Sequence, residues 1–257
     1  RSNGVELTLN ATPIRNEKFT WTIGGNATYE QNEITKLIAN ENDTTYLGLF
    51  GGGIALGRQI QISSEGYPIG SFFAYEQQYD DDGNPIEGQY RDVDGDGTSG
   101  DDNGDRVRST NPNATWFFGI NTRLNYENWE LSLSGRAKLG NYTYNNVLAQ
   151  MTNYNGIRGN TDFLNNVHRD INEVGFEQPQ ALSDFFIRNA SFFRLDFVTL
   201  SYTFPDMGKI SNLRVFGTVQ NALTITKYGG LDPEVGGIDG SVYPRSRAFL
   251  LGVSASL

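Results

Sequence analysis

The sequence has no cysteine and only one histidine, His168, among its 257 residues. Without cysteine there is neither a disulfide framework nor a cysteine-ligated metal site. The sequence also lacks an uninterrupted apolar run of about 18 residues, which a membrane-spanning helix needs. Positive charge is scarce: 20 Lys and Arg face 30 Asp and Glu, which gives a net charge of -10. Nucleic acid is therefore not an expected partner, because binding it requires a basic face.

The beginning of the chain also lacks familiar features. It starts at Arg1 rather than at a methionine, and its first residues contain neither the basic nor the apolar stretch of a signal peptide. We therefore expect either a mature protein or a fragment of a longer one.

Long stretches of strict apolar-polar alternation are what the sequence does contain. In the clearest one, from Trp116 to Leu139, apolar residues take every second position on both sides of a turn at Glu127-Asn128. Such alternation predicts β-strands with one apolar and one polar face. Each strand has about a dozen residues, enough for a tilted strand to cross a bilayer. Aromatic residues stand at both ends, as in membrane barrels.

The same pattern predicts seven long strands, at residues 5–10, 19–30, 116–126, 129–139, 198–204, 213–220 and 249–257. The links between these strands alternate in length. Residues 11–18, 127–128 and 205–211 form short links, and residues 31–112, 140–190 and 222–246 form long ones. Outer-membrane barrels combine short periplasmic turns with long extracellular loops. This order therefore predicts that the C-terminus lies on the periplasmic side.

Seven strands do not close a barrel, because bacterial single-chain barrels have an even number of strands, from about 8 upward. An open edge in lipid would leave backbone groups without hydrogen bonds, at a cost of several kcal/mol each. The sequence thus predicts an all-β fold that is the C-terminal part of a large antiparallel transmembrane β-barrel. Residues 1–257 then form one portion of the barrel domain, and the earlier strands precede Arg1.

Several ordered segments resemble one protein family. Residues 190–205 (ASFFRLDFVTLSYTFP), 213–228 (LRVFGTVQNALTITKY) and 65–73 (EGYPIGSFF) are similar to segments of SusC/RagA-type TonB-dependent transporters of Bacteroidetes. The motifs at 94–97 (DGDG), 232–235 (DPEV) and 243–245 (YPR) also fit. The last residue departs from the pattern, because family members usually end in Phe and this chain ends in Leu257.

The resemblance implies a cell outer-membrane barrel of about 22 strands, closed by an N-terminal plug that this sequence does not contain. It implies TonB-dependent import of oligosaccharides or peptides, a SusD-like surface lipoprotein as a lid, and possible pairing of two transporter-lid units. Contact with TonB would occur through the absent N-terminal part. The resemblance does not distinguish between glycan and peptide substrates.

Polar residues of the predicted strands are candidates to line the lumen of the barrel. These residues are Asn121, Arg123, Glu130, Arg136, Lys138, Arg214 and Gln220. They would face the plug and the substrate. The simpler alternative is that they only solvate the lumen or pair with one another.

An aspartate-rich segment, residues 91–105, is the densest candidate for metal binding. Aspartates at alternate positions followed by glycine match the start of a calcium loop, which supplies hard oxygen ligands. The predicted ligands are Asp92, Asp94, Asp96, Asp101 and Asp105. The match is incomplete, because position 12 is Asn103 and not Glu. If the segment binds calcium, the ion would order an extracellular loop. The alternative is a solvated Asp/Gly turn cluster without a metal ion.

Aromatic residues of the first long link are candidates for stacking on a substrate or packing on a lid protein. They are Tyr67, Phe72, Phe73, Tyr75, Tyr79 and Tyr90. Packing among themselves is the alternative. No organic cofactor is expected.

Catalysis finds no support in the sequence. The single histidine lies in a long link, and no nucleophile motif accompanies it, so we do not expect an enzyme. A second reading of the whole chain remains open: a secreted or surface calcium-binding β-sandwich that acts as an adhesin or a glycan-binding module.

Overall fold

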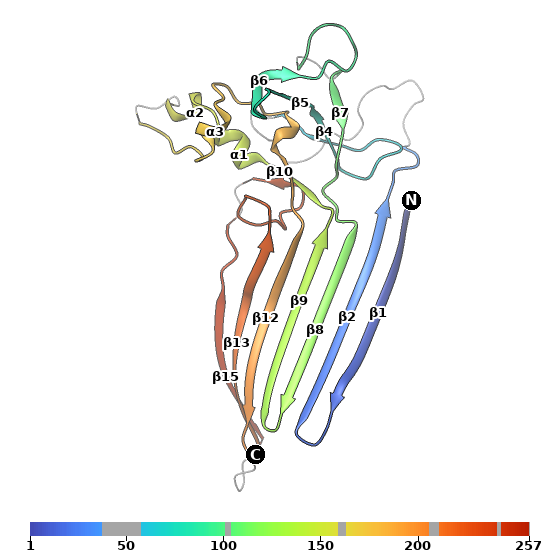
Figure 1. Cartoon of the computed structure of the whole chain (residues 1–257), viewed down its shortest axis with the longest axis vertical. Coiled ribbons are helices and arrows are strands. Elements are labelled where there is room, and N and C mark those ends of the chain that lie inside the picture. Colours follow the sequence, from blue (N-terminus) through green and yellow to red (C-terminus); the bar gives the residue numbers. More distant parts are fainter. Residues whose placement is uncertain (38–57, 101–103, 159–162, 206–210, 241–242, 257) are drawn as a thin grey trace.

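A computed structural model describes residues 1–37, 58–100, 104–158, 163–205, 211–240 and 243–256 (Figure 1). Its main element is one seven-stranded sheet in the order β1-β2-β8-β9-β12-β13-β15. The strands are β1 (Ser2–Arg15), β2 (Phe19–Asn32), β8 (Trp116–Tyr126), β9 (Trp129–Leu139), β12 (Phe192–Thr203), β13 (Ser211–Thr226) and β15 (Ala248–Ser256). All neighbours are antiparallel, so the sheet is a meander of the seven predicted strands.

Three of these strands, β1, β12 and β13, extend well beyond the alternation, past β-bulges that shift its phase. In β1 the register shifts between Ala11 and Ile14, after the predicted end at residue 10. In β12, Leu195 pairs with Gly135 and Phe197 pairs with Ser134, which leaves Asp196 as an extra residue. A matching shift in β13 lies at Asn221, whose φ is 50°. A bulge inserts one residue and moves the following side chains to the opposite face. The strict pattern therefore predicts that one strand starts at residue 198 and that the next strand ends at residue 220. In the structure, β12 begins at Phe192 and β13 ends at Thr226.

The links separate to the two ends of the sheet, as predicted (Figure 1). The short turns after β1 and β8 lie at one end, where β12 also ends, β13 begins and β15 ends at Ser256. The described parts of the long links, which run over residues 33–115, 140–191 and 227–247, gather at the other end and form what we call the loop layer. Among the described residues, no helix has the length and apolar character needed to cross a membrane.

The loop layer has its own small elements. Its strands are β3 (Gln61–Ile62), β4 (Ser71–Tyr75), β5 (Gln77–Tyr79), β6 (Pro85–Tyr90), β7 (Arg106–Arg108), β10 (Tyr142–Asn145), β11 (Ile187–Asn189) and β14 (Ile238–Asp239). Its helices are α1 (Asn146–Met151), α2 (Asn155–Arg158), α3 (Ile171–Val174) and a 3₁₀ turn at Asp184–Phe186. Strand β10 pairs with both β11 and β14, and thereby joins the second long link to the third.

The hydrophobic core lies in this loop layer and not against the sheet. Phe72, Tyr144 and Phe186 are fully buried there, and residues of the first and second long links form one cluster around them, with Ile238 of the third packed against it. Burying each such side chain contributes about 1.5 to 3 kcal/mol. The described parts of the first and second long links therefore fold as one packed unit, against which Ile238 of the third link lies.

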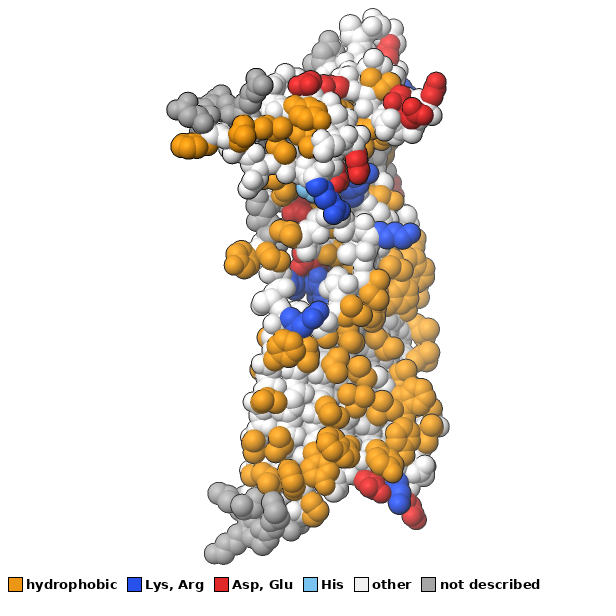
Figure 2. Space-filling model, turned by 60° about the vertical axis from the view of Figure 1, so that its left-hand side comes forward, with side chains coloured by type: hydrophobic (Ala, Val, Ile, Leu, Met, Phe, Trp, Pro, Cys, Tyr) orange, Lys and Arg blue, Asp and Glu red, His pale blue; other side chains and the backbone are white. Residues whose placement is uncertain are grey.

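The apolar face of the sheet remains exposed. Leu7, Phe249 and Leu251 are 57%, 75% and 91% exposed, and Figure 2 shows a broad hydrophobic band over the strands. In a β-sandwich this face would be buried against a second sheet. The other sheets of the described residues have only two or three strands each. The sandwich alternative is therefore wrong for the described part of the chain.

Aromatic residues mark both ends of the apolar band. Tyr29 and Trp116 contact each other near the loop layer, with ring centroids 4.9 Å apart. Trp129 and Tyr202 make a contact of 4.9 Å at the end with the short turns. This double placement matches the aromatic girdles of membrane barrels.

Candidate functional site

The polar face of the sheet is the candidate functional surface. Cross-strand pairing places all seven predicted lumen residues on this one face, since Asn121, Ser134, Phe197 and Gln220 form one row across four strands. At mid-height the face is hollowed by about 700 Å³. Arg123 is the one charged residue in the lining of this hollow, which is otherwise mostly Asn, Ser and Thr. The middle of the face can therefore hydrogen-bond to a polar neighbour but carries little charge.

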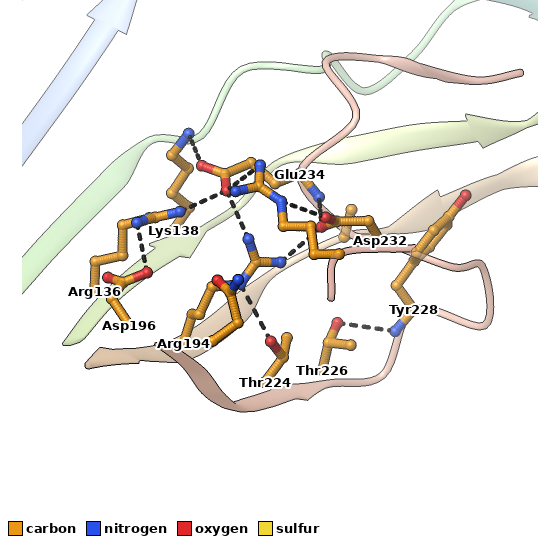
Figure 3. A network of polar contacts seen from close by, with 12 residues as sticks. Arg136, Lys138, Arg194, Asp196, Thr224, Thr226, Tyr228, Asp232 and Glu234 are labelled. Atoms are coloured by element: carbon orange, nitrogen blue, oxygen red, sulfur yellow. Dashed lines mark hydrogen bonds and ion pairs between the residues drawn. The ribbon is translucent and has the colours of Figure 1, made fainter. Parts of the chain in front are cut away.

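Charged residues gather at two levels above and below this hollow. At the short-turn end, Glu130 pairs with Arg214 at 2.8 Å and with Arg123 at 3.5 Å. At the loop end, seven residues form a larger network (Figure 3). We call it the upper network, and its members are Arg136, Lys138, Arg194, Asp196, Asp232, Glu234 and Arg245.

Glu234 is the centre of the upper network, because four cations surround it. Its Oε2 lies 2.8 Å from Arg136, 3.0 Å from Arg194 and 3.2 Å from Arg245, and its Oε1 lies 2.8 Å from Lys138 Nζ. Glu234 belongs to the third long link, whereas Arg136, Lys138 and Arg194 stand on β9 and β12. The network thus fastens this link to the inner face of the sheet.

Asp232 makes the most deeply buried pair of the network. Its Oδ1 accepts a hydrogen bond of 2.7 Å from Arg194, and the two side chains are only 4% and 3% exposed. Oδ2 accepts a bond of 2.7 Å from Arg245. Arg194 also donates to Thr224 Oγ1 at 3.2 Å. Charge-assisted bonds of this kind are stronger than neutral ones, and few donor groups of Arg194 remain unused.

Both link carboxylates stay ionised, although burial works against their charge. Burial alone would raise the pKa of Asp232, but the backbone N–H of Glu234 and the side chain of Arg194 hold it below its ordinary value. Burial likewise opposes the charge of Glu234, and Lys138 and Arg136 lower its pKa. The attachment of the third link is therefore fully charged at neutral pH.

The bulge in β12 completes the network. Asp196, the inserted residue, accepts a bond of 2.7 Å from Arg136 Nη1. Sequence reasoning identified Arg136 and Lys138 as lumen residues but missed Arg194, Asp196, Asp232, Glu234 and Arg245. The available signals were an Arg and an Asp that interrupt the apolar run of residues 192–200, and the acidic motif at 232–235, to which no role was given.

The aspartate-rich segment brings three of its five predicted ligands together. Carboxylate oxygens of Asp92, Asp94 and Asp96 all lie within 4.8 Å of one another. Asp92 accepts from the N–H groups of Gly95 and Gly97, at 2.6 and 3.1 Å. Hydrogen bonds from Thr98 lower the pKa of Asp96, so that carboxylate remains charged.

The other two predicted ligands differ. Asp105 is 1% exposed, and its two carboxylate oxygens accept hydrogen bonds from the N–H groups of Val93 and Gly100, at 2.7 and 3.2 Å, which ties the two ends of residues 93–100 together. Asp101 lies outside the described residues.

The six predicted loop aromatics divide by burial. Four of them are buried in the interior of the loop layer, as expected if these aromatic residues pack in the protein and not on a ligand: Phe72, Phe73, Tyr75 and Tyr90. Tyr90 donates a hydrogen bond to Gln180, and burial raises the pKa of its hydroxyl. Tyr67 and Tyr79 remain 39% and 50% exposed. Of the six, these two are the exposed ones, and the guanidinium of Arg108 lies over the Tyr67 ring, 5.2 Å from its centre.

No protein-family model matches the chain. The chain is 39% identical over 261 residues to the TonB-dependent receptor SusC of Bacteroides thetaiotaomicron, and the aligned region covers 98% of this chain and 26% of SusC. It is 26% identical over 289 residues to the TonB-dependent receptor P3 of Formosa agariphila, covering 98% and 28%. The solved structure of the RagAB peptide transporter matches with a TM-score of 0.74 and 26% identity, covering 98% of this chain and 29% of the other. The chain thus spans less than a third of the length of each. These relatives are receptors and a transporter, which fits the expectation that this chain is not an enzyme.

Proposed function

We propose, from the premise that this chain is a SusC/RagA-like segment of a TonB-dependent receptor, that it forms part of the wall of an outer-membrane importer of oligosaccharides or peptides. One observation carries the proposal. A meander of seven long strands exposes a continuous apolar face, while the opposite face is polar and hollowed. A membrane barrel needs this division, because its outer surface meets lipid and its lumen holds water.

The edges of the sheet support a larger barrel. In the described residues, β1 and β15 each pair along one side only. Unpaired backbone groups are not tolerated in lipid, so in the full-length protein further strands pair with both edges. A total of about 22 strands would match plugged transporters of this kind.

The distribution of the links supports an orientation. Outer-membrane barrels carry short turns on the periplasmic side and long loops outside. We infer that the loop layer faces outward and that β15 ends on the periplasmic side. A SusD-like lipoprotein would then cover the loop layer, and TonB would act through a part of the full-length protein outside this chain.

We propose two places for contact with a substrate. Tyr67 and Tyr79 present exposed rings in the loop layer, and aromatic rings stack on sugars or on peptide side chains. Below them, the inner face offers amides and hydroxyls, with charges fixed in ion pairs. The substrate would meet these groups as it passes from the loop layer toward the plug.

Two substitutions at neighbouring positions of β9 test the membrane assignment in the full-length protein. Leu133→Arg puts a charge on the apolar face, where it should cost about 2 to 4 kcal/mol at the middle of the bilayer. Ser134→Arg puts the same charge on the polar face, one residue further along. We expect only Leu133→Arg to prevent appearance of the heat-modifiable barrel in outer-membrane fractions. Equal assembly of both variants would refute the proposal.

A further inference from the structure

A second hollow, of about 340 Å³, lies beside the upper network at the loop end of the sheet. Its walls come from β12, from the end of β13 and from both legs of the third long link. Arg194, Arg245 and Arg247 line it, together with the single carboxylate Asp232. Neither the predicted lumen residues nor the proposed transport function gives this hollow a role.

The charges of this lining do not balance. Both oxygens of Asp232 are already occupied, by Arg194 and Glu234 N–H on one side and by Arg245 on the other. Glu234 is shared among the cations of the upper network. Arg194 and Arg245 are both paired with Asp232 and with Glu234, so Arg247 is the one arginine of the lining without a carboxylate partner among the described residues.

Arg247 carries the unused part of this charge. It pairs with no carboxylate in the described part of the chain, and its one hydrogen bond there runs from Nε to Asn221 O at a long 3.5 Å. Asn221 is the bulge residue of β13, held by its own bond of 2.9 Å to Ser246 O. The bulge therefore positions Arg247 at the hollow without neutralising it. Arg245 adds a second guanidinium that is 47% exposed.

We propose that this hollow binds an anionic group, a carboxylate or a phosphate, with Arg247 as the main contact and Arg245 as the second. A guanidinium presents parallel N–H groups whose spacing matches the oxygens of either anion. Thr224 and Asn221 supply polar atoms at the same wall. The inference rests on the geometry of the hollow and holds whether or not the protein imports a substrate.

Two sources supply such an anion. Arg247 comes two residues before Phe249, which is 75% exposed on the apolar face, and Figure 2 shows basic side chains above the hydrophobic band. A strand rises by about 3.3 Å per residue, so a lipid phosphate just above the apolar zone lies within reach. A soluble acidic ligand that enters through the loop layer is the other source.

The test uses the full-length receptor and four forms of it: wild type, Arg247→Gln, Arg247→Lys and the control Arg169→Gln. Arg169 is also a surface arginine, with a side chain 93% exposed, but it lies on the second long link beside Asp170. Arg247 makes a single long hydrogen bond, so its substitution should leave folding intact. Titration with inorganic phosphate, followed by ³¹P line broadening, probes a soluble anion. Native mass spectrometry from nanodiscs of phosphatidylglycerol and phosphatidylcholine probes a lipid phosphate.

We expect Arg247→Gln to weaken anion binding at least tenfold, Arg247→Lys to retain part of it, and the control to match wild type. A loss confined to phosphate broadening would assign a soluble anion, and a loss confined to retained phosphatidylglycerol would assign a lipid. If Arg247→Gln matches wild type in both measurements, the proposed site is wrong.

Discussion

Replacing Glu234 by Gln should release the third long link from the sheet. The substitution keeps the size of the side chain but removes the negative charge that four cations surround at 2.8 to 3.2 Å. Removing one partner of a buried ion pair costs about 3 to 5 kcal/mol. Because 18% of the Glu234 side chain remains exposed, we expect the lower end of this range, about 3 kcal/mol.

Hydrogen exchange of the full-length protein measures this loss directly. A cost of about 3 kcal/mol corresponds to roughly 100-fold faster exchange, and it should appear in peptides from residues 227–240. Amides of β9 and β12 should exchange as in wild type, because their ladder of hydrogen bonds does not involve Glu234. The link would then open while the sheet stays closed.

Glu127→Gln is the matched control. It removes the same charge from an exposed pair, Lys18–Glu127, whose atoms are 3.4 Å apart and whose side chains are 71% and 50% exposed. Exposed pairs contribute about 0 to 1 kcal/mol, so this variant should change exchange little. If exchange of residues 227–240 rises no more in Glu234→Gln than in Glu127→Gln, the upper network does not hold the link.

Three further predictions concern acid, calcium and the loop core. The folded-state pKa values of Asp232 and Glu234 lie below their ordinary values. The stability that these two carboxylates contribute should therefore be present at neutral pH and be lost as the pH falls through the lowered pKa values. Hydrogen exchange of residues 227–240, measured at decreasing pH, would show this loss. If Asp94 and Asp96 help to hold calcium, a chelator should speed proteolysis within residues 91–105 of the wild-type protein. The same chelator should have no effect on the Asp94→Asn/Asp96→Asn variant. Equal cleavage of the wild type with and without chelator would count against a bound calcium ion. Phe72→Ala should destabilise the loop layer by about 3 to 5 kcal/mol, measured by its thermal unfolding, whereas Tyr79→Ala should alter ligand binding and leave that transition in place.

The sequence by itself determines that the seven strands exist and which side chains share a face in their regular parts. Alternation is a local property: neighbouring residues of a strand point to opposite sides, so Trp116 to Leu139 can be divided into an apolar and a polar face without knowing their neighbours. The order of short and long links follows from the same count. These features therefore agree with the structure, including the shared face of the lumen residues from Asn121 to Gln220.

Only the tertiary structure decides which charges meet and where the core lies. Asp196 reaches Arg136 because one inserted residue shifts the phase of β12, and Glu234 reaches Lys138 across 96 positions of sequence because the third long link folds back onto the sheet. The same holds for Phe72 and Tyr90, whose burial depends on packing between separate links. Contacts of this kind depend on how distant segments fill space together, and no periodicity within one segment encodes that.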